Sequence, residues 1–437
     1  MEQFEFPKDF LMGTSVSSVM VEGGNRNTNW FKWSEDGKIN DGSHVIRGTD
    51  HWNRYQDDIG IMKELNNDTY CMSVEWSRIE PKEGQYDLEA VSHYREELST
   101  LIKNGIRPMI TLHHFSNPQW FDDIGGWANP DSVDIFTRFT SFTVSQLGDI
   151  VNDWITFNDP NITLIAAYLW AWFPPGLKEP KLLIKAMKNV IHAHIKCYTE
   201  IHSIRKKNNF PGETIVGVSI HFRILDPVNN NPLNRWAAWF AKYFSQDMLL
   251  KGMTEGKFSY PLGFGNYPVG KGKYYDFIGI NYWTRNIVNF KLDVKNLFCE
   301  LKVKDNVDKT DGGWEIYPEG LYRTCKEYYQ KYKAPIFIVQ NGLREPVEDK
   351  RPRVIYENLK YVAKLIKEGI PVKRYYIWTL IDIFECHEGE SAKLGIVEND
   401  FSTQKRTIRK SGKMYGDICK NKAVTKEITD NYLKNAE

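Results

Sequence analysis

Short apolar runs alternate with longer amphipathic stretches along the whole chain. Eight of the apolar runs are rich in β-branched and aromatic residues, as strands buried on both faces of a parallel sheet must be. These predicted strands are residues 10–16, 69–76, 108–113, 153–157, 215–222, 276–282, 335–340 and 374–380. Between them, apolar side chains recur with helical spacing, for example in residues 51–65 and 87–104. Asn129, followed by Pro130 and Asp131, is typical of a helix start.

Eight strand–helix alternations without a break in composition predict an α/β fold. We expect a single (β/α)8 TIM barrel domain that spans residues 1–437, with residues 284–314 as an inserted loop over the barrel mouth. In such barrels the functional groups lie at the C-terminal ends of the strands. The polar residues at those ends are Glu75, His113, His114, Asn158, Asp159, His221, Asn281, Gln340, Asn341, Asp382 and Glu385. Their convergence predicts a catalytic or ligand-binding mouth.

Composition narrows the possible partners. The net charge of the 437-residue chain is +1, with no basic block, which argues against nucleic acid or an anionic membrane surface. The longest apolar run, residues 162–173, is too short to cross a bilayer. The N-terminal residues do not resemble a secretory signal and the six cysteines are scattered, so we expect a cytoplasmic protein with reduced thiols. The 14 tryptophans suit either a sugar-binding cleft or an aromatic core.

Several motifs at the predicted strand ends resemble those of glycoside hydrolase family 1, the β-glucosidase family, over nearly the whole chain. They occupy residues 6–14, 73–79, 111–115, 125–127, 154–160, 313–321, 395–397 and 403–407. The resemblance implies hydrolysis of β-glycosides with retention and without a metal or organic cofactor. In that reaction an acid protonates the leaving group, and a carboxylate roughly 5–5.5 Å away attacks the anomeric carbon.

The resemblance places Asp159 at the acid/base position and Gln340 at the nucleophile position, where the family carries glutamates. Asp159 keeps the acid chemistry but draws the carboxyl back by one methylene. Displacements of about 1 Å can cost on the order of a hundredfold in rate. Gln340 is a neutral amide, so it excludes the covalent glycosyl–carboxylate intermediate.

Four more departures surround the same predicted pocket. Met20 stands where the family has a sugar-binding glutamine, and Cys71 where an arginine supports the nucleophile. Trp283 replaces a tyrosine that bonds the nucleophile, and Cys386 replaces a tryptophan beside the sugar. These combined departures favour a natural origin of the amide at position 340 over a laboratory exchange.

Other positions keep the residues of the family. The resemblance marks five of them as ligands of sugar hydroxyls or as the pocket floor: His114, Asn158, Asn281, Trp378 and Glu385. The expected partner is therefore a small-molecule glycoside or a related ligand.

Cysteine and histidine near the mouth raise two alternatives. Zinc uses ligands such as Cys71, Cys386, His387, His114 and Asp159, but their spacing matches no metal motif, so no metal is predicted. A cysteine nucleophile would need a base close by.

Three functional hypotheses follow. The first is a repurposed barrel, or pseudo-glycosidase, that binds a glycoside-like or less polar small molecule. The second is an active β-glycosidase, or a related carbohydrate enzyme, with a non-standard mechanism. It would use either an inverting base, for which the candidates are Glu75, Glu385, Glu388 and Glu390, or a substrate acyl group oriented by Gln340. The third and weakest is a structural scaffold.

Overall fold

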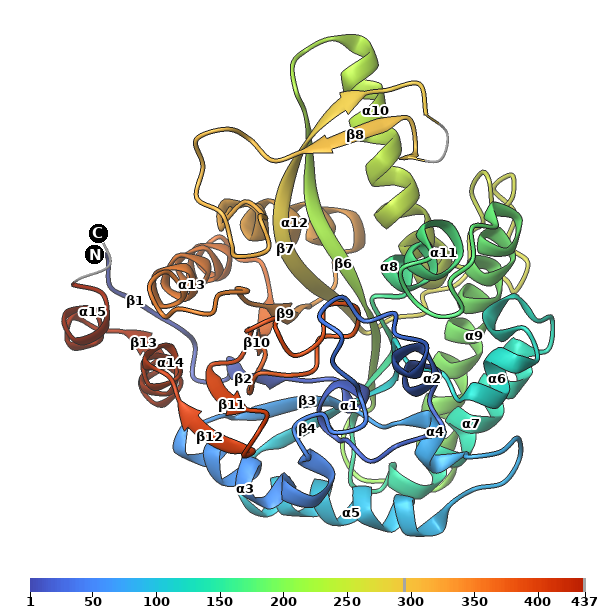
Figure 1. The fold of residues 1–437 in the computed structure, drawn as a ribbon, viewed down its shortest axis with the longest axis horizontal. Helices are drawn as coiled ribbons and strands as arrows, with labels where there is room; N and C mark the ends of the chain where they lie inside the picture. Colours follow the sequence, from blue (N-terminus) through green and yellow to red (C-terminus); the bar gives the residue numbers. More distant parts are fainter. Residues whose placement is uncertain (294–295, 435–437) are drawn as a thin grey trace.

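The computed structural model describes residues 1–293 and 296–434. Eight parallel strands close into a barrel because β6 pairs with both β5 and β7, which confirms the predicted (β/α)8 fold (Figure 1). The barrel strands are β2 (Leu11–Ser15), β3 (Thr69–Ser73), β4 (Arg107–His114), β5 (Asp153–Asn158), β6 (Ile215–Pro227), β7 (Phe277–Phe290), β9 (Ile336–Asn341) and β10 (Val372–Trp378).

A helix follows each barrel strand along the chain. In order these are α3 (His51–Glu64), α5 (Leu88–Lys103), α7 (Ser132–Leu147), α9 (Pro180–Lys207), α11 (Met248–Glu255), α12 (Glu319–Tyr332), α13 (Arg351–Lys367) and α14 (Lys410–Asn421). The apolar spacing predicted α3 and α5 to within one residue at each end, and the Asp87 carboxylate caps α5 by accepting from the amides of Glu89 and Ala90. Among the described residues, none of the helices combines the length and the hydrophobicity that a membrane span requires.

The predicted helix start at Asn129 is wrong by two residues. The α7 helix begins at Ser132, and the Asn129 side chain instead accepts a hydrogen bond from the Asp131 amide in the preceding turn. Asparagine competes for nearby amides in turns as well as at helix starts, so its presence did not fix the boundary.

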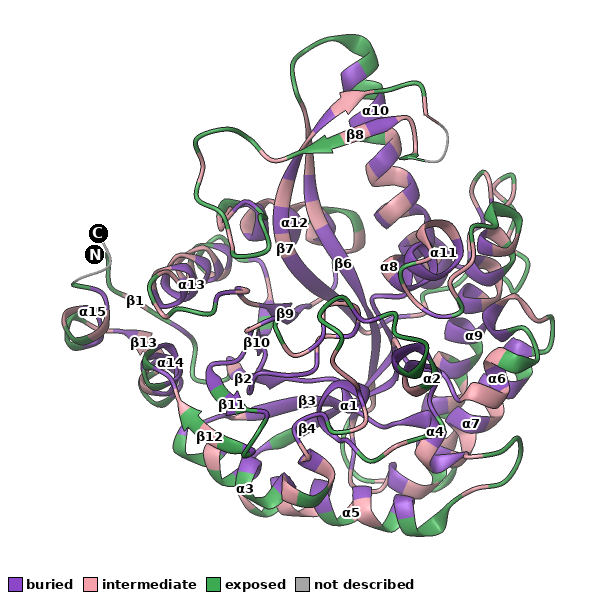
Figure 2. Ribbon diagram, in the orientation of Figure 1, coloured by how far each residue is buried: buried purple, intermediate pink, exposed green. Residues whose placement is uncertain are grey.

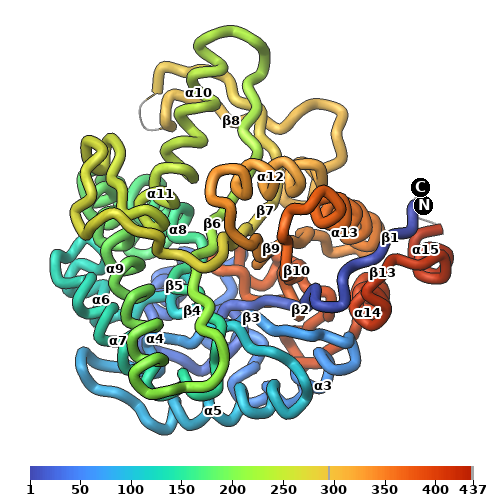
Figure 3. The backbone as a smooth tube through the Cα atoms, turned by 180° about the vertical axis from the view of Figure 1, so that it is seen from behind, coloured from blue at the N-terminus to red at the C-terminus, as the bar shows by residue number. Residues whose placement is uncertain are grey.

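About a third of the expected loop over the mouth is strand. β7 continues to Phe290, and it pairs with the extended end of β6 as far as Val288 and with β8 (Cys299–Lys302). The helix α10 (Pro232–Lys242) packs on this ribbon through alanines and Val288, and the two project together from the barrel (Figures 1 and 3). Residues 294 and 295 of the predicted segment lie outside the described residues. The sequence did not predict that β6 and β7 remain paired beyond the barrel rim, because polar and apolar residues are mixed in this segment.

The barrel strands are buried along most of their length (Figure 2). Their inward side chains pack together, so the interior is a core rather than a pore. One interior layer consists of Cys71, Met109, Ile155, Phe277, Phe337, Val339 and Tyr376. At the N-terminal end of the strands the buried Arg374 guanidinium donates to the Asp153 carboxylate at 2.7 Å.

The remaining elements are short. They are β1 (Phe4–Glu5), α1 (Ser18–Val21), α2 (Asn29–Glu35), α4 (Trp76–Ile79), α6 (Gln119–Asp123), η1 (Gly126–Ala128), α8 (Pro160–Ile165), η2 (Ala166–Trp170), η3 (Tyr243–Asp247), β11 (Val397–Asp400), β12 (Lys405–Ile408), β13 (Ala423–Val424) and α15 (Lys426–Tyr432). The strands β1 and β13 pair, which brings residues near the start of the chain beside residues 423–424 (Figure 3).

Candidate active site

A bulge at the tip of β9 turns Gln340 toward the barrel axis. Ile280 pairs with Ile338, but the next residue of β7, Asn281, pairs with Gln340, so Val339 is one extra residue in β9. Such a bulge places two consecutive side chains on one face of the sheet. Val339 therefore packs in the interior layer, and Gln340 Nε2 lies 3.4 Å from His114 Nε2.

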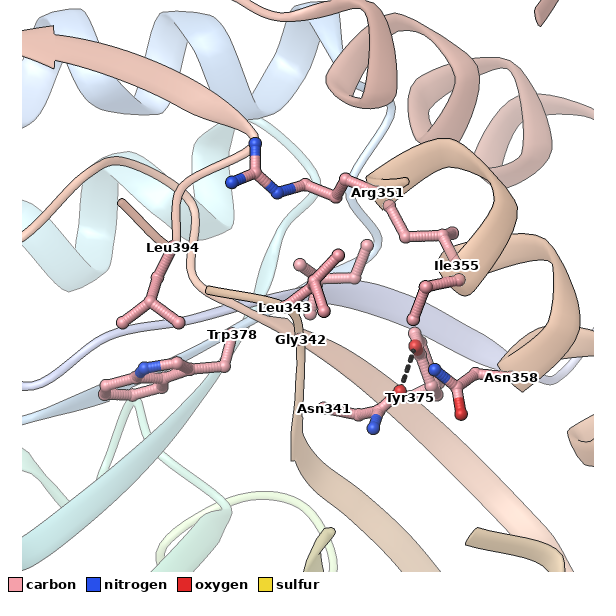
Figure 4. Close-up of a pocket in the computed structure, with 11 residues that line it drawn as sticks. Asn341, Gly342, Leu343, Arg351, Ile355, Asn358, Tyr375, Trp378 and Leu394 are labelled. Carbon is pink, nitrogen blue, oxygen red and sulfur yellow. Dashed lines mark hydrogen bonds between the residues drawn. The ribbon is translucent and has the colours of Figure 1, made fainter. Parts of the chain in front are cut away.

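Asn341, the next residue, lies on the other side of the strand. Its Oδ1 accepts a hydrogen bond from the Tyr375 hydroxyl at 2.8 Å, beside a cavity of about 10 Å³ that Asn358 also lines (Figure 4). A sugar cannot fit a space of this size, because ligand pockets measure roughly 300–1,000 Å³. Gln340 and Asn341 therefore have different surroundings although they are neighbours in the sequence.

The neutral His114 ring matches an amide at position 340. Its Nε2 atom lies 2.9 Å from Asn158 Nδ2, an amide donor, so Nε2 acts as the acceptor. Burial lowers the pKa of His114 to about 3, which keeps the ring neutral. The neutral Gln340 amide lies 3.4 Å from this nitrogen without repulsion, whereas an ionised carboxylate would place a negative charge against its lone pair. The exchange at position 340 is therefore compatible with the hydrogen bonding around it.

Asp159 lies at the end of β5 and is almost fully buried. Its backbone adopts φ 47° and ψ 43°, a left-handed conformation that aspartate tolerates better than most residues. Its Oδ1 accepts a hydrogen bond from Asn281 Nδ2 at 2.7 Å. Burial raises the pKa of Asp159 well above its ordinary value, and the nearby Glu385 charge raises it further. Burial therefore favours the protonated acid over the carboxylate.

Asn281 links Asp159 to the rest of the cluster. Its Nδ2 also donates to Asn158 Oδ1 at 2.9 Å, and Ser219 Oγ donates to the same oxygen at 2.6 Å. The Asn281 Oδ1 atom is buried and has no hydrogen-bond partner among the described residues. An unpaired buried acceptor is costly, so this atom is suited to a donor brought by a ligand.

Glu385 and Trp378 join this cluster from the segment that follows β10. Burial raises the pKa of Glu385 to about 7; the Glu388 charge raises it, and a hydrogen bond to Trp378 lowers it. The Trp378 ring lies 5.5 Å from the His114 ring. The structure thus brings together seven of the predicted residues: Asp159, Gln340, His114, Asn158, Asn281, Trp378 and Glu385.

The other four predicted residues do not join this network of polar contacts. Cys71 belongs to the interior layer, with its sulfur 3.9 Å from Thr111 Oγ1. Met20 and Cys386 are buried in the main core, and the Met20 carbonyl accepts from the Phe384 amide at 3.1 Å. Trp283 is partly exposed and stacks on His221 at 6.4 Å. Their predicted contact with a substrate stays a prediction.

The metal and thiolate alternatives gain no support. Within the described part of the chain, no three histidine, cysteine, aspartate or glutamate side chains are grouped closely enough to hold a metal ion. Burial raises the pKa of Cys71 to about 12 and that of Cys386 well above its ordinary value. Both residues are therefore thiols at neutral pH, and a thiol is a poor nucleophile.

The strand β6 carries two site residues that the sequence did not point to, Ser219 and Arg223, on either side of His221, which it had placed at the mouth. Ser219, His221 and Arg223 alternate with apolar residues that face the helices, so their side chains lie on the mouth side of the strand. His221 Nδ1 lies 3.9 Å from Asp159 Oδ2, and its Nε2 lies 3.1 Å from Arg223 Nη2. The period-two alternation of residues 217–223 could have revealed this face, since Ser219 and Arg223 occur two residues before and after His221.

A closed parallel barrel with a buried acid at its C-terminal end defines the broad class of the protein. Comparison with known proteins specifies it, because the family model of glycosyl hydrolase family 1 matches residues 2–264 and 269–424. The chain belongs to this family.

Known members of the family resemble the chain over almost its full length. It is 30% identical to Beta-glucosidase A of Thermotoga maritima, with 95% of this chain and 98% of the relative covered. It is 27% identical to the Beta-galactosidase of Pyrococcus woesei, covering 98% and 100%. The solved beta-glycosidase from Pyrococcus horikoshii superimposes with a TM-score of 0.91 at 32% identity, covering 99% and 98%. The beta-glucosidase from Thermotoga maritima in complex with glucoimidazole superimposes with a TM-score of 0.90 at 27% sequence identity. This match covers 96% of this chain and 100% of that one.

Proposed function

We propose that the protein hydrolyses β-glycosides, with Asp159 as the general acid and water, rather than a carboxylate of β9, as the attacking nucleophile. The observation that carries this proposal is the buried Asp159 carboxyl at the C-terminal end of the barrel, whose pKa is raised well above its ordinary value. A general acid must hold its proton at the working pH, and burial of a carboxyl is the usual means to that end.

Glu385 is the best candidate for the base that activates the water. Glu75 accepts hydrogen bonds from the hydroxyls of Ser18, Ser77 and Ser116, which occupy its oxygens. A charge on Glu385 raises the pKa of Asp159, so the two carboxyls share one electrostatic environment.

The remaining two candidates are less suited to this role. Glu388 forms an ion pair with Arg344 at 3.1 Å. At Glu390 the backbone amide donates a hydrogen bond to Ser43 Oγ at 3.1 Å.

An inverting glycosidase requires two carboxyl groups, one protonated as the acid and the other ionised as the base.

The walls of the site support a sugar as the ligand. The unpaired Asn281 Oδ1 can accept from a hydroxyl, and the Trp378 ring offers an apolar face. The buried Met20 and Cys386 make the surroundings less polar, which favours glycosides with fewer hydroxyl contacts. Relatives named as a β-glucosidase and a β-galactosidase support hydrolysis over the binding-only hypothesis.

A second candidate function is binding without turnover, and Gln340 is the observation that favours it. Incubation with 4-nitrophenyl β-D-glucoside and β-D-galactoside at high enzyme concentration separates the two. We expect nitrophenol release above the level given by Asp159→Asn protein prepared in the same way. Binding of these glycosides in calorimetry without any release would contradict hydrolysis and support the second candidate.

A further inference from the structure

Arg223 places a positive charge beside the candidate acid. It follows Ser219 and His221 on the same face of β6, and the His221 ring lies between its guanidinium and Asp159. The side chain is partly exposed, so a molecule in the barrel mouth can reach it.

The guanidinium has no carboxylate partner among the described residues. Its Nη2 bonds to His221 Nε2 at 3.1 Å and its Nη1 to Asn286 Oδ1 at 3.3 Å. Both partners are neutral, because burial lowers the pKa of His221 well below its ordinary value and Asn286 is an amide. By contrast, Arg285 on the adjacent strand forms an ion pair with Glu315 at 2.6 Å. A charge held in this way without a counter-ion is costly unless a ligand supplies one.

The guanidinium is still charged and still has donors to offer. Burial lowers the pKa of Arg223 to about 10, which leaves it cationic at neutral pH. A guanidinium carries five N–H groups, and the two contacts above use two of them. The remaining groups are enough for a carboxylate, which accepts two parallel hydrogen bonds from arginine.

Aromatic rings surround this cation. The Trp314 ring lies 5.8 Å from the guanidinium carbon, and Trp283 stacks on His221 while it meets Trp314 edge to face at 6.4 Å. Apolar walls around a cation suit a flat organic anion better than a hydrated inorganic one, because the rings exclude competing water.

We propose that Arg223 forms an anion subsite for a carboxylate carried by the leaving group of the glycoside. Arg223 lies near Asp159 and not near Gln340. If Asp159 is the acid that protonates the leaving group, as proposed above, Arg223 lies on the leaving-group side of the scissile bond. The substrate class is therefore a β-glycoside whose aglycone is aromatic and bears a carboxylate.

The test compares two glycosides that differ only in this charge. The probes are 4-carboxyphenyl β-D-glucoside and its neutral amide, 4-carbamoylphenyl β-D-glucoside, and calorimetry measures the dissociation constant of each. We expect wild-type protein to bind the carboxylate about tenfold more tightly, the size of one charge-assisted hydrogen bond. Arg223→Gln should bind the two probes equally, and Arg223→Lys should keep part of the preference. Arg353→Gln, at an exposed ion pair with Asp308, is the matched control and should keep all of it.

Equal binding of the two probes by wild-type protein, no binding of either, or an unchanged preference in Arg223→Gln would overturn the subsite. Thermal melting of each variant shows whether the substituted proteins are folded, and Arg223→Lys provides a charged variant if Arg223→Gln does not fold. Preference for the carboxylate without hydrolysis of either probe would support the subsite and contradict the proposed hydrolysis. Hydrolysis of both probes without a preference for the carboxylate would support the proposed hydrolysis and contradict the subsite.

Discussion

Replacement of Asp159 by asparagine should reduce hydrolysis of cellobiose about a hundred- to ten-thousandfold, the range expected when a general acid is lost. The loss should be small for 2,4-dinitrophenyl β-D-glucoside. Its leaving group departs as a stable anion and does not need a proton. This dependence on the leaving group separates proton donation from general damage to the site. The measurement is kcat/KM for both substrates in wild-type and variant protein.

The same variant has a predicted stability signature. In the folded protein the pKa of Asp159 is raised, so the unfolded chain releases this proton at a lower pH than the native state does. Stability is therefore lost as the pH rises from the ordinary aspartate pKa through the raised one. Asp159→Asn should be more stable than wild type at pH 7 and equal to it at pH 4 in urea unfolding. Asp134→Asn, on the surface of α7, is the matched control.

In the kinetic experiment, equal losses of kcat/KM on cellobiose and on 2,4-dinitrophenyl β-D-glucoside would contradict the role of Asp159 as the acid.

Replacement of Glu385 by glutamine should lower kcat about a hundredfold, because the variant cannot take a proton from water. Since the pKa of Glu385 is about 7, hydrolysis by the wild type should increase as the pH rises through this value and the base ionises. At higher pH the rate should fall again as Asp159 loses its proton. The two carboxyls interact, so the limbs of the profile belong to the pair.

The variant should lose the rise near pH 7 as well as the rate. Azide, which needs no base, should restore turnover and form a glycosyl azide. Glu398→Gln, at an exposed position of β11, should leave the profile unchanged. A profile in Glu385→Gln that keeps its rise near pH 7 would show that another group is the base.

The barrel could be predicted because strands buried on both faces must be continuous apolar runs. All eight runs became strands, since the pattern reflects burial itself. Register is a different matter, because it depends on how neighbouring strands pair. The extra residue Val339 in β9 decides that Gln340 faces inward, and nothing in the local alternation of residues 335–340 indicates it.

The sequence motifs predicted those residues of the candidate site that stand at the ends of barrel strands. Asp159, Asn281 and His114 lie together because they occupy strand ends, which the barrel brings to one face. The place of Cys71 in the barrel could not be predicted from its motif alone. A side chain as short as cysteine stays in the interior layer and does not reach the polar cluster. Arg223 has no motif, and its importance is visible only in its lack of a carboxylate partner within the described structure.

The anomer first released from a β-glycoside tests the central claim most directly. Wild-type protein is mixed with 4-nitrophenyl β-D-glucoside, and proton NMR follows the sugar before it mutarotates. Attack by water opposite the leaving group predicts that α-glucose appears first. If β-glucose appears first, the reaction passes through a second displacement, and water is not the first nucleophile at the site of Gln340.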